Sequence, residues 1–260
     1  EASRRIIELS GARLLEIARI PRDYFAWREG IEDHCIYQLD LPDDRGNNGG
    51  DGKMLNLSQY ENKIVRIVDT GGQAFTGVPV SFPSEYGMHE FGREEESVKL
   101  HDYQLFESDI AEIRELPNFS IIRATETWQQ AGAYYVRIQA MAKKHHITLR
   151  QEFDEHDGPD TKYIVITDSD FPIATARMYP LNQKDMMIGR VVVLPEYRRQ
   201  GIGTMVVSAC EDWAEELHFA KTVLESRENK VAFYEQMLYE VCGEAVDGDT
   251  FRCIRMEKEL

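Results

Sequence analysis

The chain contains 260 residues, of which 42% are hydrophobic, and its 46 acidic side chains outnumber 30 basic ones, giving a formal net charge of −16 at pH 7. This size and apolar content provide for one large domain or two small ones, and no run of about 18 apolar residues predicts a membrane helix. The acidic balance disfavours nucleic acid, whose phosphates it would repel, and suits a cationic partner such as an amine, although solubility alone is the simpler interpretation.

The first residues, Glu1 to Arg5, lack the apolar stretch of a secretory signal. Four scattered cysteines show no spacing typical of a zinc site. They are Cys35, Cys210, Cys242 and Cys253. We therefore expect a cytoplasmic protein with reduced, buried thiols and without a metal or a membrane contact. The sequence does not specify an oligomeric state and leaves a homodimer open.

The N-terminal part carries no recognisable chemistry. Apolar residues spaced among charges over residues 4–19 predict an amphipathic helix that ends before Pro21. Cys35 to Leu39 form a possible strand. The Gly-, Asn- and Asp-rich run from Leu41 to Gly52 is typical of a flexible linker. We therefore treat residues 1–52 as an N-terminal segment and linker without an assigned role.

Residues 53–116 read as a small all-β unit. Lys63 to Val68 alternates polar and apolar residues, Thr70 to Gln73 predicts a hairpin turn, and Ala74 to Val78 forms the return strand. Further strands are expected at residues 97–100, 103–106 and 108–113. The combination of Lys63-x-Val65-Arg66-Ile67 with Gly71-Gly72-x-x-Phe75-x-Gly77 resembles small Sm-like barrels, which implies binding to RNA or to proteins. The acidic run Glu94 to Glu96 argues against RNA, so we expect a role in protein interaction or self-association.

Residues 117–260 alternate strands and helices. Strands are expected at 120–124, 163–167, 172–179, 187–194, 222–225, 240–244 and 251–258, and helices at about 125–145, 202–217 and 229–238. Thr125 with Thr127 and Asn229 are residues that commonly cap helices, and we expect them to cap the first and the third.

The most informative stretch is Arg190 to Thr204. Val191 to Leu194 predict a buried strand that Pro195 ends, Gly201 and Gly203 allow a close backbone approach, and a helix begins at about Ile202. The first N–H groups of a helix lack internal partners and attract anions, and the arginine pair 198–199 adds positive charge beside them. This arrangement favours a phosphate or pyrophosphate ligand, although two such glycines also serve ordinary helix–strand packing.

The pattern Arg198-x-x-Gly201-x-Gly203 resembles the acyl-CoA signature of the GNAT superfamily of N-acetyltransferases, and the resemblance covers about residues 118–260. It implies an α+β fold, in which a mixed, splayed sheet carries helices on both faces, and acetyl-CoA as co-substrate. By this resemblance, a strand backbone pairs with the pantetheine arm and the turn holds the pyrophosphate. The implied cofactor-binding residues are Val191, Val192, Val193, Arg198, Arg199, Gln200, Gly201, Ile202, Gly203, Thr204 and Asn229.

The run Asn229-Lys230-Val231-Ala232-Phe233-Tyr234 is similar to a shortened form of a second family motif. The resemblance makes Tyr234 the general acid that protonates the leaving thiolate, while core packing with Phe233 is the alternative interpretation. The chain has Leu238-Tyr239 where the family often has Gly-Phe.

A general base must take a proton from the attacking amine, and the candidates are carboxylates. Gln151 to Asp157 resembles the acidic stretch of a GNAT subgroup of unsettled substrate. We assign the catalytic role to Glu152 and acceptor binding to Asp154, Asp157 and Glu225, against the alternative of a solvated acidic loop.

These features predict an N-acetyltransferase that moves an acetyl group from acetyl-CoA to a small-molecule or peptide amine by direct attack in a ternary complex. The alternative is a non-catalytic acyl-CoA-binding or scaffold protein whose small barrel recruits a protein partner. A third hypothesis, an RNA-associated factor, would need a basic or aromatic stripe on the barrel, and the sequence offers little of one.

Overall fold

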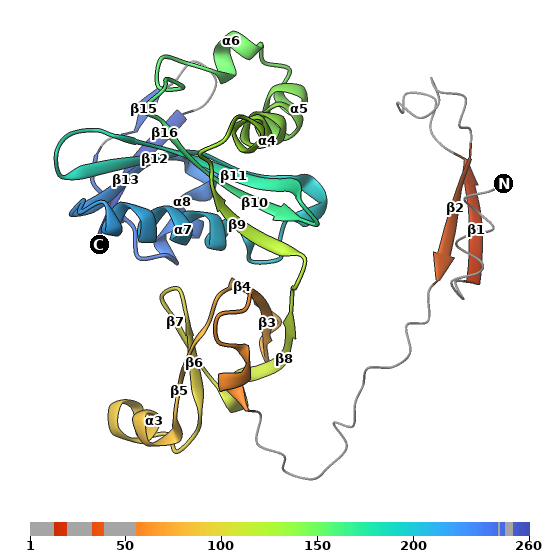
Figure 1. Ribbon diagram of the computed structural model, residues 1–260, viewed down its shortest axis with the longest axis vertical. Coiled ribbons are helices and arrows are strands. Elements are labelled where there is room, and N and C mark those ends of the chain that lie inside the picture. The colour runs from red at the N-terminus through yellow and green to blue at the C-terminus, as the bar shows by residue number, and fades with distance from the viewer. Residues whose placement is uncertain (1–12, 20–32, 39–55, 244, 248–251) are drawn as a thin grey trace. The chain divides into compact units, whose positions relative to one another are not determined.

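A computed structural model describes residues 13–19, 33–38, 56–243, 245–247 and 252–260 (Figure 1). The chain divides into two compact units, Glu1–Lys53 and Met54–Leu260. Among the described residues, no helix is both long enough and apolar enough to cross a membrane.

The first unit contains an antiparallel pair of strands, β1 (Arg13–Arg19) and β2 (Asp33–Gln38). The predicted helix over residues 4–19 is therefore wrong for residues 13–19, and its first part lies outside the described residues. Pairing with β2 supplies the backbone hydrogen bonds that a helix would make internally, and a short apolar pattern does not distinguish the two. The linker predicted at residues 41–52 also lies outside the described residues.

The second unit begins with a small β domain, which we define as residues 56–116. Its strands form two three-stranded sheets, in the orders β4-β3-β8 and β5-β6-β7. They are β3 (Val65–Asp69), β4 (Ala74–Gly77), β5 (Val80–Phe82), β6 (Ser97–Leu100), β7 (Tyr103–Phe106) and β8 (Ile110–Glu115). One buried cluster, which includes Leu57, Val65, Ile67, Val98 and Leu100, serves both sheets. The resemblance to Sm-like barrels stays a prediction.

Four elements of this domain were not expected from the sequence. Strand β5 follows β4 after two residues, and helix α3 (Ser84–Phe91) then precedes β6. A short 3-10 helix, η1 (Leu57–Tyr60), leads into the domain, and another, η2 (Glu107–Asp109), separates β7 from β8. Gly92 ends α3 in the left-handed region, where glycine carries no steric cost.

The remainder of the unit is a mixed sheet of eight strands, in which β15 pairs with β16 beside the path β14-β16-β13-β12-β11-β10-β9. The strands are β9 (Phe119–Arg123), β10 (Lys162–Asp168), β11 (Phe171–Pro180), β12 (Asp185–Val193), β13 (Lys221–Arg227), β14 (Glu240–Val241), β15 (Val246–Asp247) and β16 (Arg252–Glu259). Their neighbours are antiparallel except β12 and β13, which are parallel. The expected α+β architecture with a mixed sheet is thus present.

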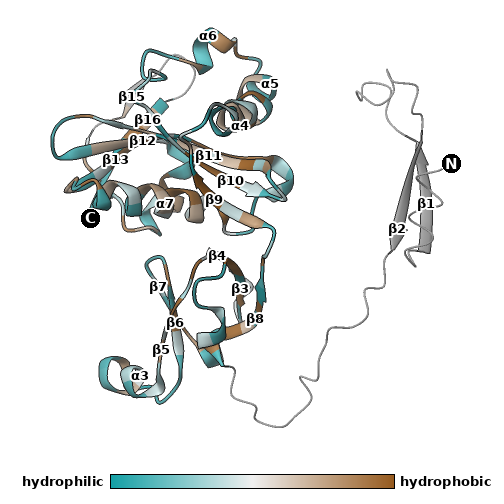
Figure 2. Ribbon diagram, viewed as in Figure 1, coloured by the Kyte–Doolittle hydropathy of each residue, from teal (hydrophilic) through white to brown (hydrophobic). Residues whose placement is uncertain are grey.

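Helices cover both faces of this sheet (Figure 1). One face carries α4 (Thr127–Arg137), which continues through the π-helical segment η3 (Ile138–Ala142) into α5 (Lys143–His145), and α6 (Leu149–Glu152). The other carries α7 (Ile202–Glu216) and α8 (Val231–Glu235), with 3-10 turns η4 (Pro195–Tyr197) and η5 (Glu228–Lys230) before them. The middle strands are coloured as hydrophobic in Figure 2 because both of their faces are buried.

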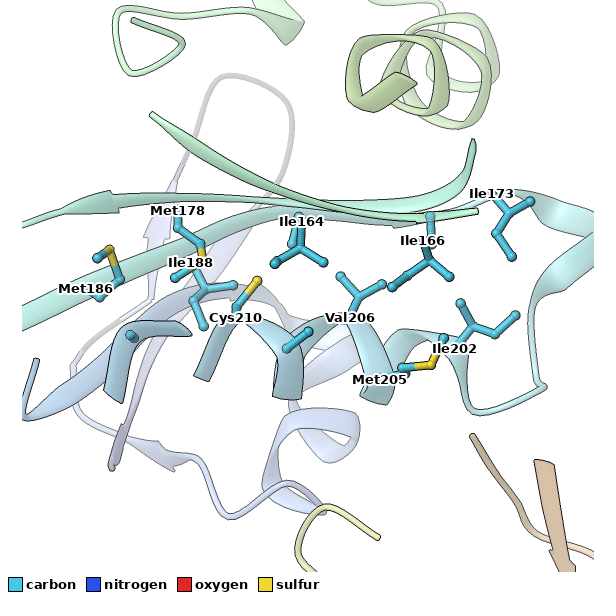
Figure 3. Close-up of a cluster of buried hydrophobic side chains, with 14 residues drawn as sticks. Ile164, Ile166, Ile173, Met178, Met186, Ile188, Ile202, Met205, Val206 and Cys210 are labelled. Carbon is cyan, nitrogen blue, oxygen red and sulfur yellow. The ribbon is translucent and has the colours of Figure 1, made fainter. Parts of the chain in front are cut away.

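The main core lies between α7 and strands β10 to β12. Figure 3 shows Ile164, Ile166, Ile173, Met178, Met186 and Ile188 of the strands above Ile202, Met205, Val206 and Cys210 of the helix. The helix residues recur at the three- and four-residue spacing of one helical face, as the sequence predicted. This packing fixes the N-terminus of α7 at the end of β12.

The predicted helix caps need correction. Glu126 rather than Thr125 or Thr127 is the N-cap of α4, and the Gln129 side chain accepts hydrogen bonds from the Thr125 and Glu126 backbone N–H groups. Asn229 lies inside η5, and Lys230 occupies the N-cap position of α8 without a side-chain cap. A 3-10 turn at residues 228–230 displaces the helix start, so the Asn229 side chain is exposed and caps nothing.

Candidate functional site

The sheet opens between its two parallel strands. β12 and β13 pair only from Asp185 to Ile188 against Lys221 to Leu224, although β12 continues to Val193 and β13 to Arg227. On its other side, β12 stays paired with β11 up to Val193. Within the described residues, the facing backbone edges beyond Ile188 and Leu224 therefore have no strand partner. Such edges offer N–H and C=O groups to an extended ligand.

A β-bulge marks the point where the strands part. Thr175 pairs with Val192, but Arg177 pairs with Gly189, so β12 carries two residues, Arg190 and Val191, opposite one residue of β11. Arg190 has a φ of 51°, in the left-handed region that non-glycine residues seldom adopt. Bulges bend a strand and redirect its side chains and backbone groups, and they are frequent beside active sites.

The turn after β12 has the backbone form of an anion site. Arg199 and Gly201 lie in the left-handed region, with φ of 58° and 79°, and the right-handed helix α7 begins at Ile202. A left-handed residue followed by a right-handed one turns successive N–H groups toward one point. No side chain caps this helix, so its first N–H groups remain available among the described residues.

Side chains of the turn hold its shape. Arg198 Nε donates to the Val193 carbonyl (2.9 Å), and Gln200 Nε2 donates to the Glu196 carbonyl (3.1 Å). The Arg198 side chain therefore ties the turn back to the end of β12, while Arg199 is exposed. The structure brings together all the residues from Val191 to Thr204 that the sequence nominated for cofactor binding, at one end of the opening.

Tyr234 lies beside this opening. Its ring belongs to a cluster with the partly buried Val191 and Phe233, and the Tyr234 and Phe233 ring centroids are 4.9 Å apart. Burial, reinforced by Cys210, raises the pKa of Tyr234 well above its ordinary value, whereas Arg227 opposes the rise. The phenol therefore stays protonated at neutral pH. A protonated hydroxyl beside the opening can give a proton to a departing group.

Three of the nominated carboxylates, Glu152, Asp154 and Asp157, form ion pairs with arginines. Glu152 is 1% exposed and Arg137 is fully buried, and Arg137 Nε donates to Glu152 Oε1 (2.8 Å). Arg177 contacts both Asp154 and Asp157, at 2.6 and 2.8 Å. Arg190, from the bulge, reaches Asp154 at 3.0 Å. We conclude that this cluster, which the sequence presented as an acidic loop, is largely neutralised by buried guanidinium groups.

Hydrogen bonds keep the clustered aspartates ionised. Burial alone would raise the pKa of Asp157, but donors from Arg137 and Tyr163 hold it far below the ordinary value. Burial would also raise the pKa of Asp154, but the hydrogen bond and charge of Arg177, together with the His156 N–H and the Arg190 charge, lower it. Burial and the Asp157 charge raise the pKa of the Tyr163 hydroxyl, which donates to Asp157 (2.6 Å). These two carboxylates are therefore committed acceptors of hydrogen bonds within the fold.

Glu225 differs from the other three carboxylates because it is exposed. Leu224 of β13 packs toward α8, so alternation along the strand places Glu225 on the opposite face, the one that carries α4 to α6. Arg227 shares that face and contacts the Met141 sulfur of η3 (3.5 Å). Glu225 thus lies on the part of β13 that extends beyond its pairing with β12.

No local motif in the sequence marks the arginines that pair with these carboxylates. Arg137 lies on α4 and Arg177 on β11, and they meet the acidic stretch only after folding. Arg190 stood in the informative stretch without an assigned role. An arginine at an apolar position of a predicted helix or strand was the available signal. Because arginine is seldom fully buried without a partner, such a position predicts a buried acidic partner.

Residues 122–238 match the sequence model of the Acetyltransferase (GNAT) family. The uncharacterized N-acetyltransferase YjcF of Bacillus subtilis is 26% identical over 116 residues, which cover 45% of this chain and 81% of that protein. An uncharacterized acetyltransferase of Streptococcus pyogenes is 26% identical over 112 residues, covering 43% of this chain and 79% of that protein.

Among solved structures, the crystal structure of a candidate N-acetyltransferase from Lactobacillus plantarum matches with a TM-score of 0.53 at 29% identity, covering 55% of this chain and 98% of that chain. These similarities show a GNAT acetyltransferase domain with the acyl-CoA N-acyltransferase fold, which places the domain in the acyltransferase class. The small β domain lies outside the residues that the family model matches.

Proposed function

We propose that the chain, which carries a GNAT acetyltransferase domain over residues 122–238, transfers an acetyl group from acetyl-CoA to a primary amine by direct attack in a ternary complex. The observation that carries this proposal is the opening between β12 and β13, which leads directly to the turn at Arg199 and Gly201. One extended ligand with amide groups at one end and a pyrophosphate at the other would satisfy both features.

Each part of acetyl-CoA has a place in this arrangement. The amides of the pantetheine arm would pair with the free backbone edge of β12 at Val191 and Val193, as an added strand does. The pyrophosphate would accept hydrogen bonds from the N–H groups of Arg199 to Thr204 at the start of α7. The exposed Asn229 amide lies on η5, at the end of β13, and would face the arm from the other side.

The reaction needs one charge stabilised and two protons moved. A strand N–H at Val192 or Val193 would polarise the thioester carbonyl as the amine attacks and negative charge develops on the oxygen. Tyr234, held protonated by burial, would give its proton to the sulfur as the C–S bond breaks. No metal is required for these steps.

For the general base we favour Glu225 over Glu152. Glu152 is almost fully buried and accepts hydrogen bonds from the buried Arg137, so an acceptor amine has no direct path to it. Glu225 is exposed on the opened part of β13 and can take the proton directly or through a water. In this assignment, Glu152, Asp154 and Asp157 organise the acceptor side through their arginines.

The acceptor is a small-molecule or peptide amine. We retain residues 53–116 as a separate Sm-like domain that contacts a protein, and residues 117–260 as the catalytic domain. Both belong to the compact unit Met54–Leu260, although each has its own hydrophobic core.

A thiol-release assay tests the function. Acetyl-CoA is offered with polyamines, aminoglycosides, amino acids and peptides with free N-termini, and at least one amine should accelerate release of CoA. Tyr234→Phe should lower kcat by about 100-fold while the Kd of acetyl-CoA changes less than about twofold. Tight acetyl-CoA binding without release by any amine would instead favour the non-catalytic acyl-CoA-binding protein.

A further inference from the structure

The small β domain contacts the same turn that the proposed function assigns to the pyrophosphate. The hydroxyl of Thr76, on β4, donates a hydrogen bond to the Gln200 carbonyl, 124 residues away in the sequence. Thr76 is fully buried, so this hydroxyl has no access to water that could replace the bond. In Figure 1, β4 lies next to the layer formed by α7.

Gly201 packs closely against the backbone of β4. A Cβ atom on Gly201 would lie 2.5 Å from the Thr76 backbone nitrogen and 2.8 Å from the Phe75 carbonyl carbon. Both neighbours are backbone atoms that cannot turn aside. The left-handed φ of 79° independently favours glycine at this position. The turn and β4 therefore fit closely, at a distance that admits no side chain at Gly201.

Contacts away from the turn fix the domain in this position. The Tyr103 hydroxyl donates to the Gln236 carbonyl (2.9 Å), just after α8. Lys258 of β16 bridges Asp102 (2.7 Å) in the small β domain and Glu211 (3.0 Å) on α7. The turn itself stays accessible from its other side, because Gly201, Gly203 and Thr204 all remain partly exposed.

We propose that Thr76 is a positioning residue for acyl-CoA binding, through which the small β domain sets the orientation of the pyrophosphate turn. The peptide bond between Gln200 and Gly201 is trans, so its C=O and N–H point in opposite directions. When Thr76 holds the Gln200 carbonyl toward β4, the Gly201 N–H points away from β4, toward the open side of the turn. The inference rests on the proposed function, because it assumes that this open side receives the pyrophosphate.

The test compares two ligands that differ in the pyrophosphate. Thr76→Val removes the hydroxyl and keeps the shape of the side chain. The Kd of acetyl-CoA, measured by calorimetry, should rise by about three- to tenfold, the loss expected for one hydrogen bond. S-acetylpantetheine has the thioester arm but no pyrophosphate, and its Kd, measured by NMR titration, should change less than about twofold. Thr76→Ser retains a hydroxyl and should restore most of the affinity for acetyl-CoA.

Tyr103→Phe is the matched control, because it removes another hydrogen bond between the same two parts of the chain without touching the turn. It should leave the Kd of acetyl-CoA unchanged. An unchanged Kd in folded Thr76→Val, or an equal loss in Tyr103→Phe, would overturn the inference. Failure of the wild-type chain to bind acetyl-CoA would instead refute the proposed function, so the two failures are distinguishable.

Should Thr76→Val not fold, Thr76→Ala replaces it, and hydrogen exchange of the wild-type chain gives an independent result. Acetyl-CoA should slow amide exchange in the peptide containing Thr76 as well as in the turn, since the ligand tightens a contact that both share. Slowing in the turn alone would contradict the coupling.

Discussion

Arg137 and Glu152 form an ion pair in which both side chains are buried, with 0% and 1% of their surface exposed and 2.8 Å between Nε and Oε1. Arg137 also donates to the Glu152 carbonyl and to Asp157, so one guanidinium joins α4 to the acidic stretch. The phenyl ring of Phe153 lies 4.2 Å from the guanidinium carbon. This arrangement makes Glu152 part of the buried framework of the fold.

Removing one member of this pair should destabilise the fold. Arg137→Met leaves the buried Glu152 and Asp157 charges without their main partner, and we expect a loss of about 3–5 kcal/mol in the free energy of unfolding. Urea denaturation of the purified chain measures the loss. Arg123→Met, which breaks the exposed pair with Glu216, is the control and should cost less than about 1 kcal/mol. Similar losses in both variants would contradict the structural role of the buried pair.

Kinetic measurements should distinguish the two candidate general bases, Glu225 and Glu152. Glu225→Gln should lower kcat by about 100-fold, because the exposed carboxylate takes the proton in the proposed reaction. Glu152→Gln should chiefly lower the unfolding free energy, since its partner Arg137 keeps only a neutral acceptor. Activity and urea denaturation are measured for both variants. A kcat that is retained in Glu225→Gln and lost in folded Glu152→Gln would restore Glu152 as the base.

The two glycines of the turn should tolerate alanine differently. Gly201→Ala places a methyl group 2.5 Å from backbone and at a left-handed φ, so we expect strain of at least about 1–3 kcal/mol. A Cβ on Gly203 would meet only the Phe233 ring, at 3.4 Å, and Gly203 has no left-handed φ. Gly203→Ala should therefore stay within about 0.5 kcal/mol of the wild type. Thermal unfolding of both variants checks the contrast, and equal stability would be inconsistent with the close approach of β4.

The small β domain should weaken as the pH falls below neutrality. Burial lowers the pKa of His101, although its hydrogen bond to the Thr76 carbonyl (2.9 Å) and the nearby Asp102 oppose this, while Lys258 adds to it. Because the unfolded chain binds the proton first, stability is full above the ordinary pKa of 6.5 and declines as the pH falls through it toward the lower folded value.

The measurement is the unfolding free energy at pH 7.5 and pH 5.5, with His101→Asn as the matched variant. His101 has a φ of 57°, and asparagine tolerates that conformation while lacking the titrating ring. The wild type should lose more stability than the variant across this interval. A parallel decline in both proteins would show that other groups cause it.

Local sequence patterns predicted much of the fold of residues 117–260. The apolar run from Val191 to Leu194 and the apolar helix face from Ile202 to Cys210 depend only on residues that are close together in the sequence. The structure confirmed the strand, the turn and the helix that these patterns predicted. In the small β domain, the strands at residues 97–100 and 103–106 lie where alternation placed them. The helix prediction for residues 13–19 was wrong because pairing with the partner strand, and not local periodicity, decided their conformation.

The site was only partly predictable, because its critical contacts join distant residues. The residues around Glu152 in the sequence do not predict its ion pair with Arg137. Those around Gln200 do not predict its hydrogen bond with Thr76. The carboxylates of residues 152–157 therefore predict a cation-binding pocket when the sequence is considered alone, because their arginine partners are distant in the sequence. The start of α8 is displaced by a 3-10 turn, so Asn229 is exposed and does not cap the helix. The residue type at position 229 does not reveal that turn.

The most direct test of the account is calorimetric titration of acetyl-CoA into the wild-type chain, Gly203→Asn and Gly203→Asp. The two variants add side chains of nearly equal shape, but the aspartate also places a negative charge at the first turn of α7, where the pyrophosphate should lie. We predict near-micromolar binding to the wild type, weaker binding to Gly203→Asn, and at least about tenfold weaker binding again to Gly203→Asp. No binding by the wild type, or equal affinity in the two variants, would contradict an acyl-CoA site at this turn.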